Sequence, residues 1–179
     1  MKKHPRKVLI VSCSLNAGSR SHRLAVAAEA TLKDGDCLTT LVDLRDYDLP
    51  MCDGATTYDA PAAKELAKMI AEADVILLAA PIYNYDLNAA AKNLVELTGS
   101  AWKDKVVGFL CAAGGRSSYM SPMGLANSLM FDFRCVIVPR FVYATGEDFR
   151  DAGELSDIVQ GRIEQLCTEA VKLANGLAG

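Results

Sequence analysis

Several features that would place this chain in a specialised class are missing from its sequence. It has two histidines, and its six cysteines include no C-x-x-C pair, so the usual spacings of zinc and iron–sulfur ligands are absent. No apolar run approaches the roughly 20 residues that span a bilayer. The net charge of −3 lacks the excess of Lys and Arg typical of nucleic-acid-binding proteins. We therefore expect no metal, no membrane and no nucleic acid among its partners.

A basic cluster in residues 1–7 is followed by the apolar run 8–11. Because that run is shorter than the h-region of a signal peptide, about 7–15 residues, we interpret residues 1–6 as a solvated tail. The remainder, within 1–179, has the length of a single domain. Three of the six cysteines lie inside or at the ends of apolar runs, where a thiol is a small buried hydrophobe, and reduced thiols favour a cytoplasmic location.

Apolar and helical segments alternate along the chain. Near-continuous apolar runs predict buried strands, and apolar spacing of three to four residues predicts helices between them. This alternation predicts an α/β flavodoxin-like three-layer sandwich, with a five-stranded parallel sheet of order 2-1-3-4-5 and helices on both faces. The connection 45–60 is long enough to line a site or a subunit contact. The predicted strands are 8–11, 38–42, 75–80, 106–112 and 136–142, and the predicted helices are 21–32, 61–73, 88–98, 121–133 and 152–177.

The loop after the first predicted strand, residues 12–21, is rich in hydroxyl groups and leads directly into a helix. A helix N-terminus with Ser14, Ser19 and Ser21 beside it suits a phosphate group. The loop lacks the G-K-[ST] of a P-loop, the G-x-G-x-x-G of a dinucleotide site and the acidic cluster of a receiver domain. A simple capping loop, with Ser19 or Ser21 as the N-cap, is the alternative.

Two further loops follow predicted strands. Residues 81–88 contain Tyr83, Asn84 and Tyr85, which could border a flat ligand; alternatively, the two tyrosines pack on neighbouring helices. Residues 112–118 contain Gly114, Gly115 and Arg116, which could approach a ligand closely or form an ordinary turn with a surface charge. Ligands of open α/β sheets bind at the carboxyl ends of the strands, so the three loops together predict a site for a flat phosphorylated ligand such as FMN.

The sequence resembles the NAD(P)H-dependent FMN reductase family over about residues 7–175. The family's phosphate loop, S-x-x-x-x-S-x-S or G-S-x-R-x-x-S, and its paired glycines after the fourth strand both have counterparts here. So does its P-x-Y-N motif with a following K-N. The chain departs from the pattern at Cys13, at Asn16 and at residues 88–90, which replace a Pro/Gly-containing turn. The matching residues are Ser14, Ser19, Arg20 and Ser21, then Pro81, Tyr83, Asn84, Lys92 and Asn93, then Gly114 and Gly115.

The resemblance implies FMN and NAD(P)H as cofactors, with hydride transfer from the nicotinamide to FMN and on to a small acceptor. It implies no obligatory catalytic residue, and a homodimer or homotetramer formed through helices beside the flavin, with 121–133 as one candidate face. Ser14, Asn16, Ser19, Arg20 and Ser21 would hold the phosphate. The ring would meet Pro81, Ile82, Tyr83, Asn84 and Tyr85, and its pyrimidine end would meet Gly114, Gly115, Arg116 and Ser117.

Two other interpretations stay open from the sequence. One is a flavodoxin-type electron carrier without its own NAD(P)H oxidation, although a net charge of −3 is mild for that class. The other is a flavin-free member of the family that binds a different phosphorylated ligand.

Overall fold

The computed structural model of the protein describes residues 5–150 and 154–177. Its strands form a parallel sheet of order β2-β1-β3-β5-β6. Two short strands lie off this path, because β4 pairs antiparallel with β3 and β7 pairs parallel with β5. β4 is the return of a hairpin, and β6 and β7 share the position of one strand, so the predicted order is confirmed. The strands are β1 (Arg6–Ser12), β2 (Cys37–Asp43), β3 (Val75–Tyr83), β4 (Asp86–Leu87), β5 (Val106–Ala112), β6 (Val136–Ile137) and β7 (Val142–Ala144).

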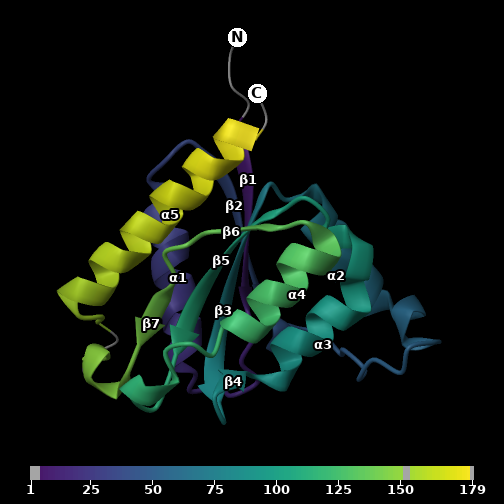
Figure 1. Ribbon diagram of the computed structural model, residues 1–179, viewed down its shortest axis with the longest axis horizontal. Coiled ribbons are helices and arrows are strands. Elements are labelled where there is room, and N and C mark those ends of the chain that lie inside the picture. The colour runs from purple at the N-terminus through teal and green to yellow at the C-terminus, as the bar shows by residue number, and fades with distance from the viewer. Residues whose placement is uncertain (1–4, 151–153, 178–179) are drawn as a thin grey trace.

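Helices cover both faces of the sheet (Figure 1). Successive side chains of a strand point to opposite faces, and β1 shows this directly. Val8 and Ile10 pack with one set of helices, and Leu9 and Val11 with the other. This burial on two faces explains why the strands are near-continuous apolar runs. The helices α1 (Arg20–Lys33) and α5 (Asp157–Leu177) lie on the first face, and α2 (Pro61–Glu72), α3 (Ala89–Thr98) and α4 (Met123–Phe133) lie on the second.

Pro61 and Gly99 set two helix ends, and Gly108 allows a strand to pack closely against its neighbours. Pro61 occupies the first turn of α2, and Gly99, with φ of 40°, ends α3. In the middle of β5, a Cβ at Gly108 would lie 2.9 Å from side-chain atoms of both Leu77 and Leu166. Any larger residue there would therefore require the Leu77 and Leu166 side chains to shift.

The last strand and last helix differ from the prediction. Instead of one strand over 136–142 there are two short ones, because Pro139 has no N–H to donate to the ladder with β5. Helix α5 begins at Asp157, since the Ser156 hydroxyl caps it by accepting from Val159 N at 3.3 Å. Residues 152 and 153 of the predicted helix lie outside the described residues.

The observed bounds of the N-terminal tail and of two connections also differ from the predicted ones. Arg6 belongs to β1, and residues 1–4 of the predicted tail lie outside the described residues. Strand β3 continues through residues 81–83, which were predicted as loop. The connection 45–60 contains two short 3₁₀ turns, Leu44–Asp46 and Thr57–Asp59. Within the described ranges, no helix has the length and apolarity needed to cross a bilayer.

Candidate functional site

The three predicted loops meet at the carboxyl ends of β1, β3 and β5, where they enclose a cleft of about 230 Å³. Three of its lining residues, Gly18, Ala112 and Ala113, were not predicted. They directly adjoin predicted residues at the same strand ends, so extending each motif by one or two positions would have found them. The remaining lining residues are the predicted Ser14, Asn16, Ser19, Arg20, Ser21, Pro81, Ile82, Tyr83 and Gly114.

Five predicted residues are not among those lining the cleft: Asn84, Tyr85, Gly115, Arg116 and Ser117. The first two form the tip of the β3–β4 hairpin, and the last three follow Gly114 in the glycine-containing loop. They lie next to lining residues in sequence and form the continuation of these two walls.

The first loop is packed so that its hydroxyl groups are buried but turned toward the cleft. Ser14, Ser19 and Ser21 are 2%, 8% and 0% exposed and line the cleft. Ser19 caps α1, with its Oγ accepting from His22 N at 3.2 Å and lying 2.9 Å from Ser21 Oγ. Ser14 Oγ accepts from Asn16 N at 3.3 Å. The capping alternative is therefore correct for Ser19, and it is compatible with a binding role.

Some hydroxyl protons of the first loop have no acceptor among the residues that the structure describes. Each of Ser14 and Ser19 accepts a backbone N–H, which leaves the hydroxyl proton to be donated elsewhere. Ser19 and Ser21 have two hydroxyl protons, and their mutual bond uses one. In the described part of the chain, no protein acceptor takes the Ser14 proton or the second proton of the pair. The first N–H groups of α1 have no acceptor within the helix. Hydroxyl donors and backbone N–H donors therefore lie together at the start of α1.

Arg20 brings a positive charge to the same wall. Its guanidinium carbon lies 5.6 Å from the centre of the Phe149 ring. A Cβ at Gly146 would come within 3.2 Å of Arg20 Nη1, so a larger residue there would displace the guanidinium. Phe149 and Gly146 thus fix the direction of Arg20, and Phe149 contributes the attraction between a cation and an aromatic face.

The β3–β4 hairpin at the second wall is strained. Tyr83 pairs with Asp86, and the two residues between them, Asn84 and Tyr85, have φ of 50° and 65°. Two consecutive residues of positive φ define a type I′ turn, for which Asn-Gly is preferred. Tyrosine at the second position is unusual and is expected to cost about 1–2 kcal/mol. Tyr83 and Tyr85 are 54% and 68% exposed, so the alternative that both pack on neighbouring helices is wrong.

A buried amide joins the first wall to the second. Asn88 Nδ2 donates to the Cys13 carbonyl at 2.7 Å, and Asn88 N donates to the Pro81 carbonyl at 3.1 Å. Asn88 Oδ1 is buried and has no partner in the described residues. Burial, with a smaller contribution from the Asp43 charge, raises the pKa of the Cys13 thiol, so Cys13 is an uncharged packing residue. Two departures from the family pattern, Cys13 and Asn88, therefore contact each other.

The third wall has open space beside its glycines. A Cβ at Gly114 or Gly115 would meet no atom within 4 Å, so open space lies beside the backbone at both residues. Tyr143 Oη donates to the Gly115 carbonyl at 2.6 Å and fixes the loop. The Arg116 side chain is 83% exposed and forms an ion pair with Glu147 at 3.0 Å. An exposed pair of this kind is worth about 0–1 kcal/mol, so it holds Arg116 weakly.

The K-N part of the second motif has structural roles. Asn93 lies in α3, where its Oδ1 accepts from Cys52 N at 2.8 Å and its Nδ2 donates to the Pro50 carbonyl at 2.9 Å. Asn93 thereby attaches the connection 45–60 to α3. Lys92 pairs with Glu96 one turn along the same helix, at 2.7 Å.

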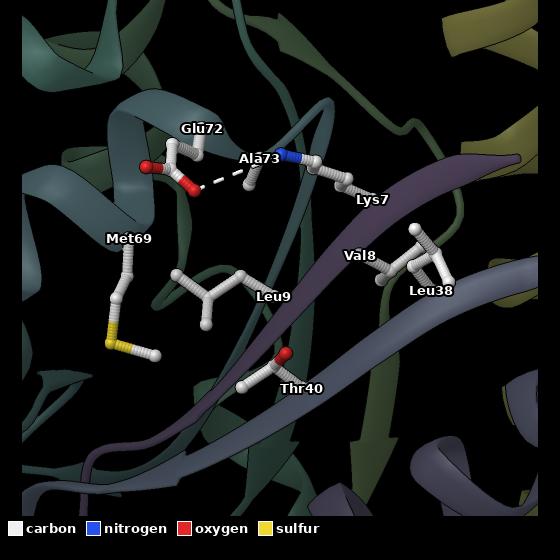
Figure 2. A pocket seen from close by; sticks show the side chains of 8 residues that line it. All are labelled: Lys7, Val8, Leu9, Leu38, Thr40, Met69, Glu72 and Ala73. Carbon is white, nitrogen blue, oxygen red and sulfur yellow. Dashed lines mark ion pairs between the residues drawn. The ribbon is translucent and has the colours of Figure 1, made fainter. Parts of the chain in front are cut away.

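A second hollow, of about 280 Å³, lies at the opposite end of the sheet, between α2 and the first residues of β1 and β2 (Figure 2). Figure 2 shows Leu9, Leu38 and Met69 along its wall and the Lys7–Glu72 pair, 3.7 Å apart, at its edge. The two charges neutralise each other, and the described residues that line the hollow include no buried hydroxyl and no helix N-terminus. Size alone therefore does not distinguish the two cavities, but their donors do.

The fold and the cleft define the class: an α/β protein of flavodoxin-like architecture with neutral hydrogen-bond donors in a cleft at the carboxyl ends of its strands. The family model described as NADPH-dependent FMN reductase matches residues 6–150. The chain belongs to this family, and it is an oxidoreductase that uses FMN and NAD(P)H. The donors found above fit the phosphate of FMN, and the accessible glycine backbone fits a ring beside it.

Curated relatives agree with this assignment. An NAD(P)H-dependent FAD/FMN reductase of Geobacillus thermodenitrificans is 31% identical over 137 residues, which cover 74% of each chain. An FMN reductase (NADPH) of Pseudomonas aeruginosa is 29% identical over 180 residues, covering 96% of this chain and 94% of the relative. An NADPH azoreductase of Bacillus sp. is 27% identical over 131 residues, covering 72% and 73%.

Solved structures agree on the fold. RosB, with a bound flavin-derived intermediate, superposes with a TM-score of 0.82 at 18% identity, covering 97% of this chain and 80% of RosB. The NAD(P)H:acceptor oxidoreductase FerB of Paracoccus denitrificans gives a TM-score of 0.74 at 20% identity, covering 93% and 98%.

Proposed function

We propose that this protein holds FMN in the cleft at the carboxyl ends of β1, β3 and β5, reduces it with NAD(P)H and passes the electrons to a free flavin, a quinone or a similar small acceptor. The observation that carries this proposal is the pair of hydroxyl protons that the first loop leaves without a protein acceptor, beside the N-terminus of α1. Such donors suit a phosphate that must be bound without a large basic patch.

When bound, FMN supplies the acceptor for a hydride from the nicotinamide and returns the electrons to a second substrate. The residues of this chain bind and orient it. Ser14, Asn16, Ser19, Arg20 and Ser21 hold the phosphate, residues 81–85 border the ring, and residues 114–117 meet its pyrimidine end. No side chain has to donate or accept a proton in the first step, so we assign no obligatory catalytic residue.

The test is anaerobic addition of NADPH or NADH to the purified protein loaded with FMN. We expect the visible absorption of the oxidised flavin to disappear without any added reductase, and to return on addition of FMN, a quinone or an azo dye in excess. A flavin that stays oxidised with both nicotinamides would contradict the proposal and favour the electron-carrier alternative. The acceptor giving the largest kcat/KM would then identify the substrate class.

We also propose that the protein forms homodimers or homotetramers through α4. Leu125, Ala126 and Leu129 of this helix are buried, yet Met123 and Phe131 are 40% and 85% exposed. Because large apolar side chains exposed together on one helix are normally covered by a partner, a second copy of this chain is the expected partner. Light scattering should give at least twice the mass of one chain for the wild type, and a smaller mass for Phe131→Glu.

The cytoplasm is the proposed location. Cys13, Cys111, Cys135 and Cys167 are buried as free thiols, a state that a reducing compartment preserves. Burial raises the pKa of Cys135 to about 11 and that of Cys167 to about 12, so both remain unreactive near neutral pH.

A further inference from the structure

A charged network lies beside the phosphate loop. It links the first turn of α1 to the end of β2 and to the turn Leu44–Asp46. His22 Nδ1 lies 3.0 Å from Ser12 Oγ and 3.1 Å from Asp43 Oδ2. Arg45 donates to both carboxylate oxygens of Asp43, with Nε at 3.0 and 3.1 Å and Nη2 at 2.6 Å. None of His22, Asp43 and Arg45 lines the cleft.

Asp43 would oppose an anion if it stood alone. Its side chain is 10% exposed, and it is the last residue of β2, which pairs with β1. Burial disfavours its charged form, but the hydrogen bonds and charge of Arg45, aided by His22, outweigh burial and lower the pKa of Asp43. Asp43 is therefore a carboxylate at neutral pH, and it needs a cation to cancel its field near a dianionic phosphate.

Arg45 also contacts the phosphate loop itself. Its Nη1 donates to the Ala17 carbonyl at 3.4 Å, a long hydrogen bond. Ala17 lies between Asn16 and Gly18, both of which line the cleft. A carbonyl oxygen that pointed into the cleft would repel a phosphate, whereas this one points to a cation outside the cleft. Arg45 thus acts on the loop through its backbone and through the charge of Asp43.

We propose that Arg45 is a positioning residue that turns the Ala17 carbonyl away from the cleft and neutralises Asp43, and that it thereby sets how strongly the cleft prefers a phosphorylated flavin to a dephosphorylated one. This rests on the proposed function, because it assumes that FMN occupies the cleft. Arg45 touches no part of the ligand in this account, so it affects the phosphate end and leaves the ring end unchanged.

The test compares the dissociation constants of FMN and riboflavin for the flavin-free protein, measured by quenching of flavin fluorescence. Riboflavin has the same ring without the phosphate. For Arg45→Met we expect FMN binding to weaken about 10-fold, the size of one lost charge-assisted interaction, and riboflavin binding to change less than about 2-fold. Arg45→Lys keeps the positive charge but loses the planar guanidinium with its paired donors. Its FMN affinity should lie between those of the wild type and Arg45→Met.

Two further variants separate this effect from general destabilisation. Arg134 forms a similar two-pronged pair with Asp104, at 3.0 and 3.2 Å, at the amino end of β5. Arg134→Met should leave both dissociation constants unchanged. The double variant Arg45→Met with Asp43→Asn removes both charges, so it should recover part of the lost FMN affinity. Circular dichroism on each variant checks the fold.

The outcomes are distinct. An FMN-to-riboflavin preference that Arg45→Met leaves intact, or an equal loss of affinity for both flavins, would overturn the positioning role alone. If the wild type itself shows no preference for FMN over riboflavin, the proposed phosphate site fails and this inference fails with it.

Discussion

The two ends of the proposed FMN site, the phosphate end and the ring end, are built differently. At the phosphate end, Ser14, Ser19 and Ser21 are buried, and they are fixed by hydrogen bonds within the loop and to the first turn of α1. At the ring end, Tyr85 and Arg116 are exposed, on a strained turn and in a weak ion pair. A buried, fixed set of donors loses little entropy on binding, whereas an exposed, adaptable end lets one partner leave and another enter. If FMN binds as proposed, we expect the phosphate end to provide affinity and the ring end to allow exchange of substrates.

The largest effect is expected from Ser19→Asp. Aspartate is as good an N-cap as serine, so α1 should remain intact, but its charge would face the phosphate. FMN affinity should fall about 100-fold, or about 2.8 kcal/mol, and riboflavin affinity should stay within about 3-fold. Ser19→Asn, a neutral cap, is the control and should lose much less. Equal losses for both flavins would remove the distinction between the two ends.

A smaller effect, on stability and kinetics, is expected from Tyr85→Gly. Asn-Gly is the preferred pair for a type I′ turn, so relief of the positive φ at Tyr85 should stabilise the fold by about 0.5–1 kcal/mol in urea unfolding. FMN affinity should hardly change, whereas kcat/KM for the acceptor should differ from that of the wild type. Asn84→Gly, at a position that asparagine already tolerates, should bring no such gain. A large loss of FMN affinity in Tyr85→Gly would place binding energy at the ring end.

The acid stability of the protein tests the charges beside the phosphate end. The pKa of Asp43 is lowered in the folded state, so its contribution to stability is present above the unfolded value of about 3.9 and is lost as the pH falls through the folded value. In Arg45→Met burial acts without the opposing cation, and the pKa of Asp43 rises. Unfolding followed by circular dichroism should then begin at a higher pH than in the wild type. Identical acid profiles would show that Arg45 does not stabilise the carboxylate.

The smallest effect is expected from Arg116→Ala. An exposed cation near the pyrimidine end should favour the reduced flavin slightly, so its loss should lower the midpoint potential by no more than about 30 mV, or about 1.4 kcal/mol for two electrons. FMN affinity should change less than about 3-fold. A loss as large as that of Ser19→Asp would show that the ring end binds as tightly as the phosphate end.

The elements that the sequence predicts well are those governed by local periodicity. The apolar runs of β1, β3 and β5 and the cap at Ser19 needed no knowledge of distant partners. The break in the last strand at Pro139 could also have been predicted, because proline cannot donate to a strand ladder. The valines around it, however, favoured one continuous strand.

What the sequence could not predict depends on residues far apart in the chain. The Asn88–Cys13 bond, the Arg116–Glu147 pair and the Arg45–Ala17 contact span 75, 31 and 28 positions. Nothing in the sequence near Arg45 or Asp43 connects them to the phosphate loop. The connection comes from the register of β1 with β2, which pairs Asp43 with Ser12, the residue before the phosphate loop's Cys13.

The most direct test of the account is a crystal structure of the protein with FMN. We expect the phosphate within hydrogen-bonding distance of the Ser14 hydroxyl and the Ser19–Ser21 pair, with the ring between the β3–β4 hairpin and the glycine loop. A phosphate at the opposite end of the cleft, or FMN in the hollow between α2 and the start of β1, would contradict it.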